Sequence, residues 1–173
     1  MADFYTASII GAKIVSGKNI IAIYNGTGSG KIIKIYRIWL YNNQTQAITG
    51  VLTKFQLRRI SAIGGGIPCQ VVKYNSISDL LPSQIIITTG PSASLGDIVR
   101  QITWSTDEPA IASGGIDEAE TNSLYTLVWN CGLFNQTLQP LTFRYGEGLA
   151  INHVGTTNVG VIDSIIEFST EDV

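Results

Sequence analysis

The chain has 173 residues, of which 45% are apolar and only 14% are charged, and its formal net charge is −2. A typical soluble domain carries about 25% charged residues, so this composition predicts a surface that is partly covered by other subunits. No segment is apolar for long enough to span a membrane, and the amino terminus lacks the basic and apolar regions of a secretory signal. The sequence therefore favours a component of an assembly over a free enzyme, built as one domain.

The residue types point to β-structure. The chain contains 26 Ile, 16 Thr and 10 Val against 12 Leu, and β-branched side chains suit strands better than helices. Its 18 Gly are placed between the apolar runs, as turn residues are. We expect an all-β, single-domain β-sandwich over residues 1–173, with a jelly roll as the expected variant, eight to ten strands and little or no helix. The acidic tail at about 169–173 is expected to be flexible or to dock on a neighbour.

In chain order, the first predicted strand is 20–24, followed by a glycine-containing loop and a long strand at 31–42. Two strands around such a loop predict a hairpin. The 31–42 segment carries apolar residues on both faces, so we expect it to be central, bulged or covered by a partner, with a helix as the alternative.

The 51–60 segment alternates clearly between two faces. Phe55 and Leu57 lie on one face, and Lys54 and Arg58 lie on the other. Further strands are predicted at 69–73, 84–88, 98–104, 124–130, 141–145, 149–154 and 162–168.

Charge is unevenly distributed along the chain. Residues 1–86 hold nine Lys and Arg against two acids, and residues 87–173 hold two against eleven, so the halves carry +7 and −9. Either the charges are segregated by chance on interleaved strands, or a basic face meets an acidic face of a neighbouring subunit and fixes the register of association. The basic residues are singly spaced and the pI is near 5.3, which argues against direct nucleic-acid binding.

The sequence contains no strong match to a catalytic or ligand-binding motif. The 26–31 loop lacks the Gly-Lys-Ser/Thr ending of a phosphate loop and is followed by a predicted strand. His153 is the only histidine, so a Cys131–His153 nucleophilic pair is conceivable, but a structural strand histidine is the expected role. Cys69 and Cys131 are expected to be free buried thiols. We predict no catalytic residue, no cofactor and no metal site.

Aromatic side chains and sequons also have structural interpretations. Trp39, Trp104 and Trp129 lie in apolar strand patterns, so we expect them in the core or an interface and not in a sugar site. The three Asn-x-Thr sequons, which begin at Asn25, Asn43 and Asn135, are interpreted as turn chemistry. The candidate interface residues combine apolar strand positions with two basic ones: Ile33, Ile35, Trp39, Lys54, Arg58, Tyr125 and Trp129.

Two segments resemble small structural proteins of tailed-bacteriophage virions. Residues 24–35 with 42–45 resemble their strand–loop–strand opening, and residues 141–151, which contain the run GEGLAI, resemble their closing hairpin. The resemblance covers about a third of the chain and carries no binding residue. It implies a jelly-roll or related sandwich on the capsid surface, made in the host cytoplasm, that acts as a decoration or cement protein. Such a protein is often trimeric and binds the major capsid protein or another virion protein.

Two other functions remain as alternatives. A carbohydrate- or receptor-binding jelly-roll module needs exposed aromatic side chains at loop ends, which the strand patterns do not indicate. A sandwich-fold enzyme needs a convergent cluster of polar residues, and the sequence does not indicate one.

Overall fold

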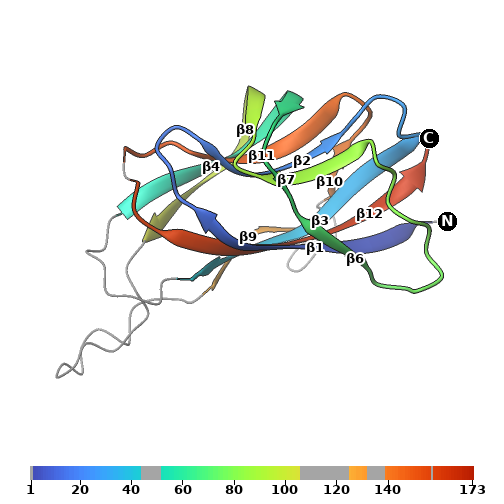
Figure 1. The fold of residues 1–173 in the computed structure, drawn as a ribbon, viewed down its shortest axis with the longest axis horizontal. Helices are drawn as coiled ribbons and strands as arrows, with labels where there is room; N and C mark the ends of the chain where they lie inside the picture. Colours follow the sequence, from blue (N-terminus) through green and yellow to red (C-terminus); the bar gives the residue numbers. More distant parts are fainter. Residues whose placement is uncertain (1, 44–51, 106–124, 132–138, 157) are drawn as a thin grey trace.

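The computed structural model describes residues 2–43, 52–105, 125–131, 139–156 and 158–173, which form two antiparallel sheets packed face to face (Figure 1). These residues contain strands and no helix. Sheet A contains β1 (Asp3–Lys13), β3 (Lys31–Asn42), β6 (Gln70–Lys73), β9 (Tyr125–Asn130), β10 (Leu141–Phe143) and β12 (Val161–Asp172). Sheet B contains β2 (Asn19–Asn25), β4 (Leu52–Gly64), β5 (Ile67–Pro68), β7 (Ile85–Thr89), β8 (Ser92–Ser105) and β11 (Glu147–His153). The prediction of an all-β sandwich is confirmed.

The strand pairing is nested from the ends of the chain inward. The first strand pairs with the last, β1 with β12, and the next pair inward is β2 with β11. Further in, β3 pairs with β9 and β10, and β4 pairs with β8. Successive strands from β1 to β4 alternate between the two sheets. The nested pairs are joined side by side where β12 pairs with β3 and β11 pairs with β4.

This alternation corrects the predicted hairpin at 20–42. Both strands exist, but β2 lies in sheet B and β3 lies in sheet A, so the glycine-containing loop carries the chain from one sheet to the other. Local sequence patterns fix the strands and the turn, whereas the choice of partner depends on strands more than 100 residues away.

The connection is held by Asn25, which is fully buried. Its Nδ2 donates to the carbonyls of Lys31 (2.8 Å) and Phe143 (3.2 Å), and its Oδ1 accepts a hydrogen bond from Ser29 (2.6 Å). Turn chemistry is therefore the role of this first sequon, as predicted. The sequon at Asn43 extends into residues outside the described part, and the one at Asn135 lies wholly outside it.

β3 is both central and bulged, as its two apolar faces predict. It pairs with β12 along one side and with β9 and β10 along the other, and the register with β12 shifts around Tyr36. An inserted residue lets the strand keep Ile33 and Ile35, and then Ile38 and Leu40, on the inner face.

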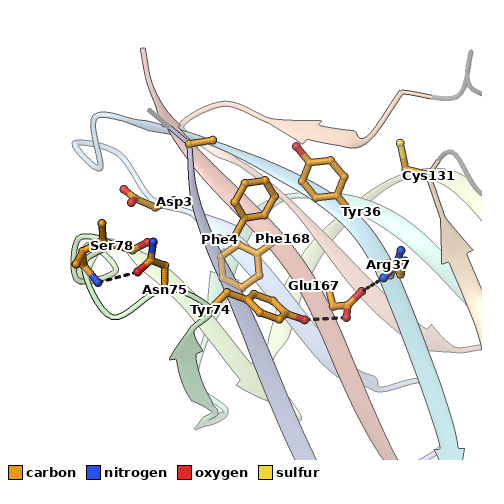
Figure 2. A pocket seen from close by; sticks show the side chains of 12 residues that line it. Asp3, Phe4, Tyr36, Arg37, Tyr74, Asn75, Ser78, Cys131, Glu167 and Phe168 are labelled. Atoms are coloured by element: carbon orange, nitrogen blue, oxygen red, sulfur yellow. Dashed lines mark hydrogen bonds and ion pairs between the residues drawn. The ribbon is translucent and has the colours of Figure 1, made fainter.

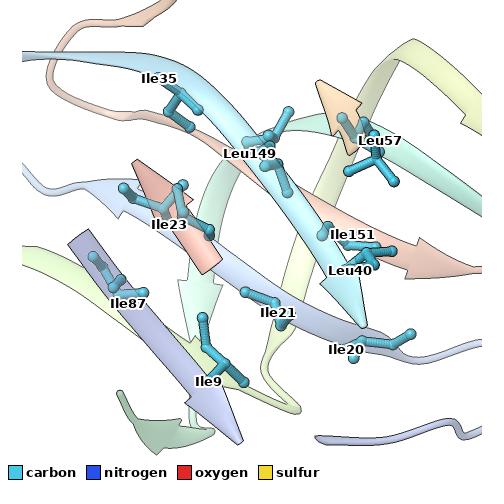
Figure 3. Close-up of a cluster of buried hydrophobic side chains, with 14 of the residues drawn as sticks. Ile9, Ile20, Ile21, Ile23, Ile35, Leu40, Leu57, Ile87, Leu149 and Ile151 are labelled. Atoms are coloured by element: carbon cyan, nitrogen blue, oxygen red, sulfur yellow. The ribbon is translucent and has the colours of Figure 1, made fainter. Parts of the chain in front are cut away.

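The core lies between the sheets and is filled mainly by isoleucine and leucine from both of them (Figure 3). Ile9 comes from sheet A, and Ile21, Leu57 and Ile151 come from sheet B. Phe55, predicted on the inward face of its strand, is fully buried. Trp104 packs against it at 5.9 Å between ring centroids, which confirms a core role for this tryptophan.

The two ends of the chain form more structure than the sequence indicated. β1 matches no predicted strand, yet its inward residues Tyr5, Ala7 and Ile9 are buried. The expectation of a flexible tail at 169–173 is wrong up to Asp172, because β12 continues to that residue, paired with β3 throughout and with β1 as far as Thr170. Ser169 and Thr170 are fully buried there.

Replacement of Asn25 by alanine should lower the free energy of unfolding by about 2–3 kcal/mol, because two carbonyls would lose their buried donor. Chemical denaturation of Asn25→Ala measures the change. The exposed Asn158 accepts one hydrogen bond from Ser16, so Asn158→Ala is the control and should change stability by about 0.5 kcal/mol or less. Equal effects of the two substitutions would contradict the role of Asn25.

Candidate interaction surfaces

The structure divides the predicted interface residues. Ile33 and Ile35 are fully buried in the core of the chain itself, so their assignment to an interface is corrected. Trp39 is half-buried, and Trp129 is half-buried and packs against the core. Tyr125 pairs with Tyr41 through its backbone, and its side chain lies outside the described part of the structure.

Lys54 and Arg58 lie on the outer face of sheet B, in agreement with the alternation of their strand. Lys54 is exposed, and Arg58 donates from its guanidinium to the carbonyl of Gly96 at 2.7 and 3.1 Å. Neither residue forms an ion pair with another described residue. Both are therefore placed to contact a partner, although their part in an interface stays a prediction.

An apolar row crosses the same face of sheet B from one side to the other. Direct register partners on β7, β2, β11, β4 and β8 form it, and we call it the sheet-B stripe: Ile86, Tyr24, Gly148, Ile60 and Leu95. Adjacent strands lie about 4.8 Å apart, so the stripe is about 19 Å wide. Ile86 and Leu95 are each 37% exposed, and Ile98 beside the stripe is 51% exposed.

The centre of the stripe is covered, since Ile60 is only 3% exposed and Gly148 is buried. The half-buried Tyr24 donates from its hydroxyl to the carbonyl of Ser61 on β4. A Cβ at Gly148 would collide with the carbonyl of Ile23 and the Cα of Tyr24, so only glycine fits there. Ala22 and Ala150, direct partners in the next row, are buried beside Ile60. Gly148 and Ala150 of the GEGLAI run thus lie on the outer side of sheet B, where both are buried, while Leu149 and Ile151 of the same run point into the core.

Some of the charge asymmetry is neutralised within the chain. Basic residues of β3 pair with acidic residues of β12: Lys34 with Glu171 (2.6 Å) and Arg37 with Glu167 (3.1 Å) on the outer face of sheet A, and Lys31 with Asp172 (2.7 Å) at the end of the two strands. The hydrogen bond to Asp172 raises the pKa of Lys31, and the same contact lowers the pKa of Asp172. Interleaved strands therefore account for these six charges, but not for Lys54 and Arg58.

A groove of about 580 Å³ lies on the outer face of sheet A, near the amino terminus (Figure 2). The rings of Phe4 and Tyr36 lie 5.7 Å apart between centroids. They flank Ser169, which is the direct partner of Phe4 and lies 3.3 Å from the Tyr36 hydroxyl. Because Ser169 is small and fully buried, the two rings close over it and form one wall of the groove.

Polar side chains converge at one end of this groove. The Tyr74 hydroxyl donates to Oε1 of Glu167 at 2.8 Å, while Nη1 of Arg37 binds Oε2 at 3.1 Å. Partial burial of the ring, followed by the hydrogen bond to Glu167 and the charge of that carboxylate, raises the pKa of Tyr74 above its usual value. The shift keeps this hydroxyl protonated, and therefore donating, up to a higher pH than in an unperturbed tyrosine.

The sequence did not indicate this groove because its aromatic residues come from three unrelated places. Phe4 lies on a strand that was not predicted, Tyr36 lies at the bulge of β3, and Tyr74 follows β6 in a loop. Only the pairing of β1 with β6, and of β12 with β1 and β3, brings them together.

His153 and Cys131 do not form a nucleophilic pair. Cys131 lines the groove on sheet A, whereas His153 is fully buried on sheet B. Nδ1 of His153 lies 3.0 Å from the carbonyl of Val15, and Nε2 contacts the Thr53 hydroxyl. Because a carbonyl only accepts, the Nδ1–H donates to Val15, and both ring nitrogens are engaged within the sandwich.

The remaining titratable groups provide no obvious chemistry in the described part of the chain. Cys69 and Cys131 are both free, as predicted, but each is half-buried and not fully buried as expected; partial burial raises the pKa of the Cys69 thiol to about 11. No group of three or more His, Cys, Asp and Glu side chains among the described residues is arranged to hold a metal ion. The same residues include no helix with the length and hydropathy needed to cross a bilayer.

The raised pKa of Tyr74 leads to a specific test. Glu167→Gln keeps an acceptor but removes the negative charge, so the pKa of Tyr74 should fall toward about 10. The ¹³Cζ signal of labelled tyrosine, assigned with Tyr74→Phe, follows this titration between about pH 8 and 12. Glu171→Gln removes a carboxylate of the same strand that pairs with Lys34 and should leave Tyr74 unchanged. A Tyr74 titration that is the same in both variants would contradict the contact.

Two outer faces thus stand out, an apolar stripe on sheet B and an aromatic groove on sheet A. The geometry of each is set by strands that are distant in the sequence. Comparison of the chain with protein-family models, with curated proteins and with solved structures gave no match.

Proposed function

We propose that this chain is a non-enzymatic structural subunit of a virion, a capsid decoration or cement protein that self-associates as a trimer and binds the capsid shell. The observation that carries the proposal is the sheet-B stripe, whose two ends, Ile86 and Leu95, together with the neighbouring Ile98, present partly exposed apolar side chains on the outer face of sheet B. Partly exposed apolar side chains grouped on one face are typical of surfaces that associate with other protein surfaces.

The topology supports the same proposal. We infer a jelly roll, since β1, β12, β3 and β9 form one four-stranded set and β2, β11, β4 and β8 form the other. Two sheets made by nested antiparallel pairs are the arrangement expected of this fold, which is common among viral capsid proteins. The short strands β5, β6 and β7 are then an insertion between β4 and β8.

Magnitudes favour apolar burial as the main source of affinity. Removal of 400 Å² of apolar surface from water contributes on the order of 10 kcal/mol before the costs of association. Exposed charge pairs contribute only about 0–1 kcal/mol each. Lys54 and Arg58, on the same face of sheet B as the stripe, would therefore act mainly on the rate and register of association.

The first test is the mass of the purified chain in solution. Light scattering coupled to size exclusion should give the mass of a trimer for the wild type and of a monomer for Ile86→Asp/Ile98→Asp, which places charges on and beside the stripe. Val72→Asp, at a position that is 48% exposed on β6 of sheet A, is the control and should remain trimeric. Immunogold labelling of virions from cells that express the chain then tests the location. A monomeric wild type at high concentration, or unlabelled virions, would refute the proposal.

The second test concerns the basic residues of sheet B. Lys54→Glu/Arg58→Glu should slow association at about 20 mM NaCl and have little effect at about 500 mM, because salt screens exposed charges. Stopped-flow light scattering after a concentration jump gives the rate. Lys13→Glu/Lys18→Glu makes the same change of charge at exposed positions elsewhere and should leave the rate closer to wild type. Rates equal to wild type at both salt concentrations would show that Lys54 and Arg58 are merely solvated.

A further inference from the structure

We propose that the groove on the outer face of sheet A binds a neutral saccharide. The groove of about 580 Å³ falls within the range of sites that bind small ligands. It lies on the opposite sheet from the sheet-B stripe, so the two surfaces can act at the same time. The proposal does not depend on the self-association proposed above.

Exposed aromatic rings are the first argument. Phe4 is 45% exposed and Tyr74 is 59% exposed, although aromatic side chains contribute strongly to stability when they are buried. Together with Tyr36 they line the same groove. The faces of such rings are electron-rich and apolar, and the C–H groups on one face of a pyranose ring are apolar and weakly positive. Stacking of a sugar ring on Phe4 or Tyr74 would cover the exposed aromatic surface.

Hydrogen-bonding side chains at both ends of the rings are the second argument. Glu167 and Arg37 lie at one end, and Asp3, Asn75 and Ser78 lie at the other (Figure 2). Each Glu167 oxygen receives one hydrogen bond from the protein and has a further lone pair for a ligand. The ion pair engages Nη1 of Arg37, and the guanidinium carries four further N–H donors. Adjacent sugar hydroxyls both donate and accept, and therefore match a carboxylate beside a guanidinium.

The charge of the groove and the pairing of its backbone favour a neutral sugar over an anionic ligand or a peptide. Arg37 is neutralised by Glu167, and Asp3 adds a negative charge, so the groove disfavours an anionic ligand. A peptide added to a sheet needs unpaired backbone groups. At the groove the Tyr74 N–H already donates to the Phe4 carbonyl, and Phe4 and Glu167 lie on strands paired within sheet A. The groove thus offers side-chain contacts and few backbone contacts, which favours a neutral sugar over a peptide.

A glycan array printed with neutral and acidic oligosaccharides, including bacterial surface polysaccharides, tests the proposal with the full-length chain. The wild type should bind at least one neutral saccharide, and titration calorimetry with that saccharide gives the affinity. Tyr74→Ala and Phe4→Ala should each weaken binding about tenfold or more, since aromatic stacking and the buried area are both lost. Arg37→Met should weaken it as well, while Leu95→Ala on sheet B serves as the control and should bind like the wild type.

Each other outcome overturns the proposal. These outcomes are no binding to any printed saccharide, binding only to acidic ones, or neutral binding that Tyr74→Ala and Phe4→Ala leave unchanged. Selection from a random peptide library of ligands that Tyr74→Ala abolishes, with no saccharide bound, would assign the groove to peptides instead. Because Phe4 and Tyr74 are about half exposed, these variants should stay folded by circular dichroism and keep the solution mass of the wild type, whatever that mass is, which separates a failure of this proposal from a failure of self-association.

Discussion

The antiparallel pairing of β1 with β12 is the constraint on which the rest of the sandwich depends. It places the start and the end of the chain side by side, and the pairs β2–β11, β3–β9 and β4–β8 then follow inward. Both outer surfaces described above are products of this nesting. Such long-range pairing closes large loops before most contacts form, so slow folding is expected relative to domains with local contacts.

Strand positions could be read from the sequence, while partners could not. The 31–42 strand, its central position and its bulge follow from apolar residues on both faces, and the core positions of β4 follow from alternation. Both strands are indicated by the spacing of apolar residues along the segment itself, which does not depend on distant residues. The loop after Asn25 shows the limit, since glycines that suit a hairpin suit equally well a turn between two sheets.

The ends of the chain show a different limit. β1 contains Thr6, Ser8 and Gly11 among its apolar residues, and 169–172 reads as a polar tail, so neither segment is apolar enough to be recognised as a central strand. Each becomes a strand because it lies beside the other. The groove depends on the same pairing, and for that reason it was invisible in the sequence, whereas Lys54 and Arg58 were placed correctly on one face of one strand.

The adjacency of the two ends also makes the topology nearly that of a closed ring. Asp3 and Thr170 are register partners, and antiparallel partners lie only about 5 Å apart between Cα atoms. A linker of a few residues would join the termini and preserve every strand pair. Opening the joined chain at a different loop would then change the order of the strands along the sequence but not their pairing. Circular permutants opened at an exposed turn are therefore compatible with this sandwich, and they would separate the contribution of chain connectivity from that of the strand pairs themselves.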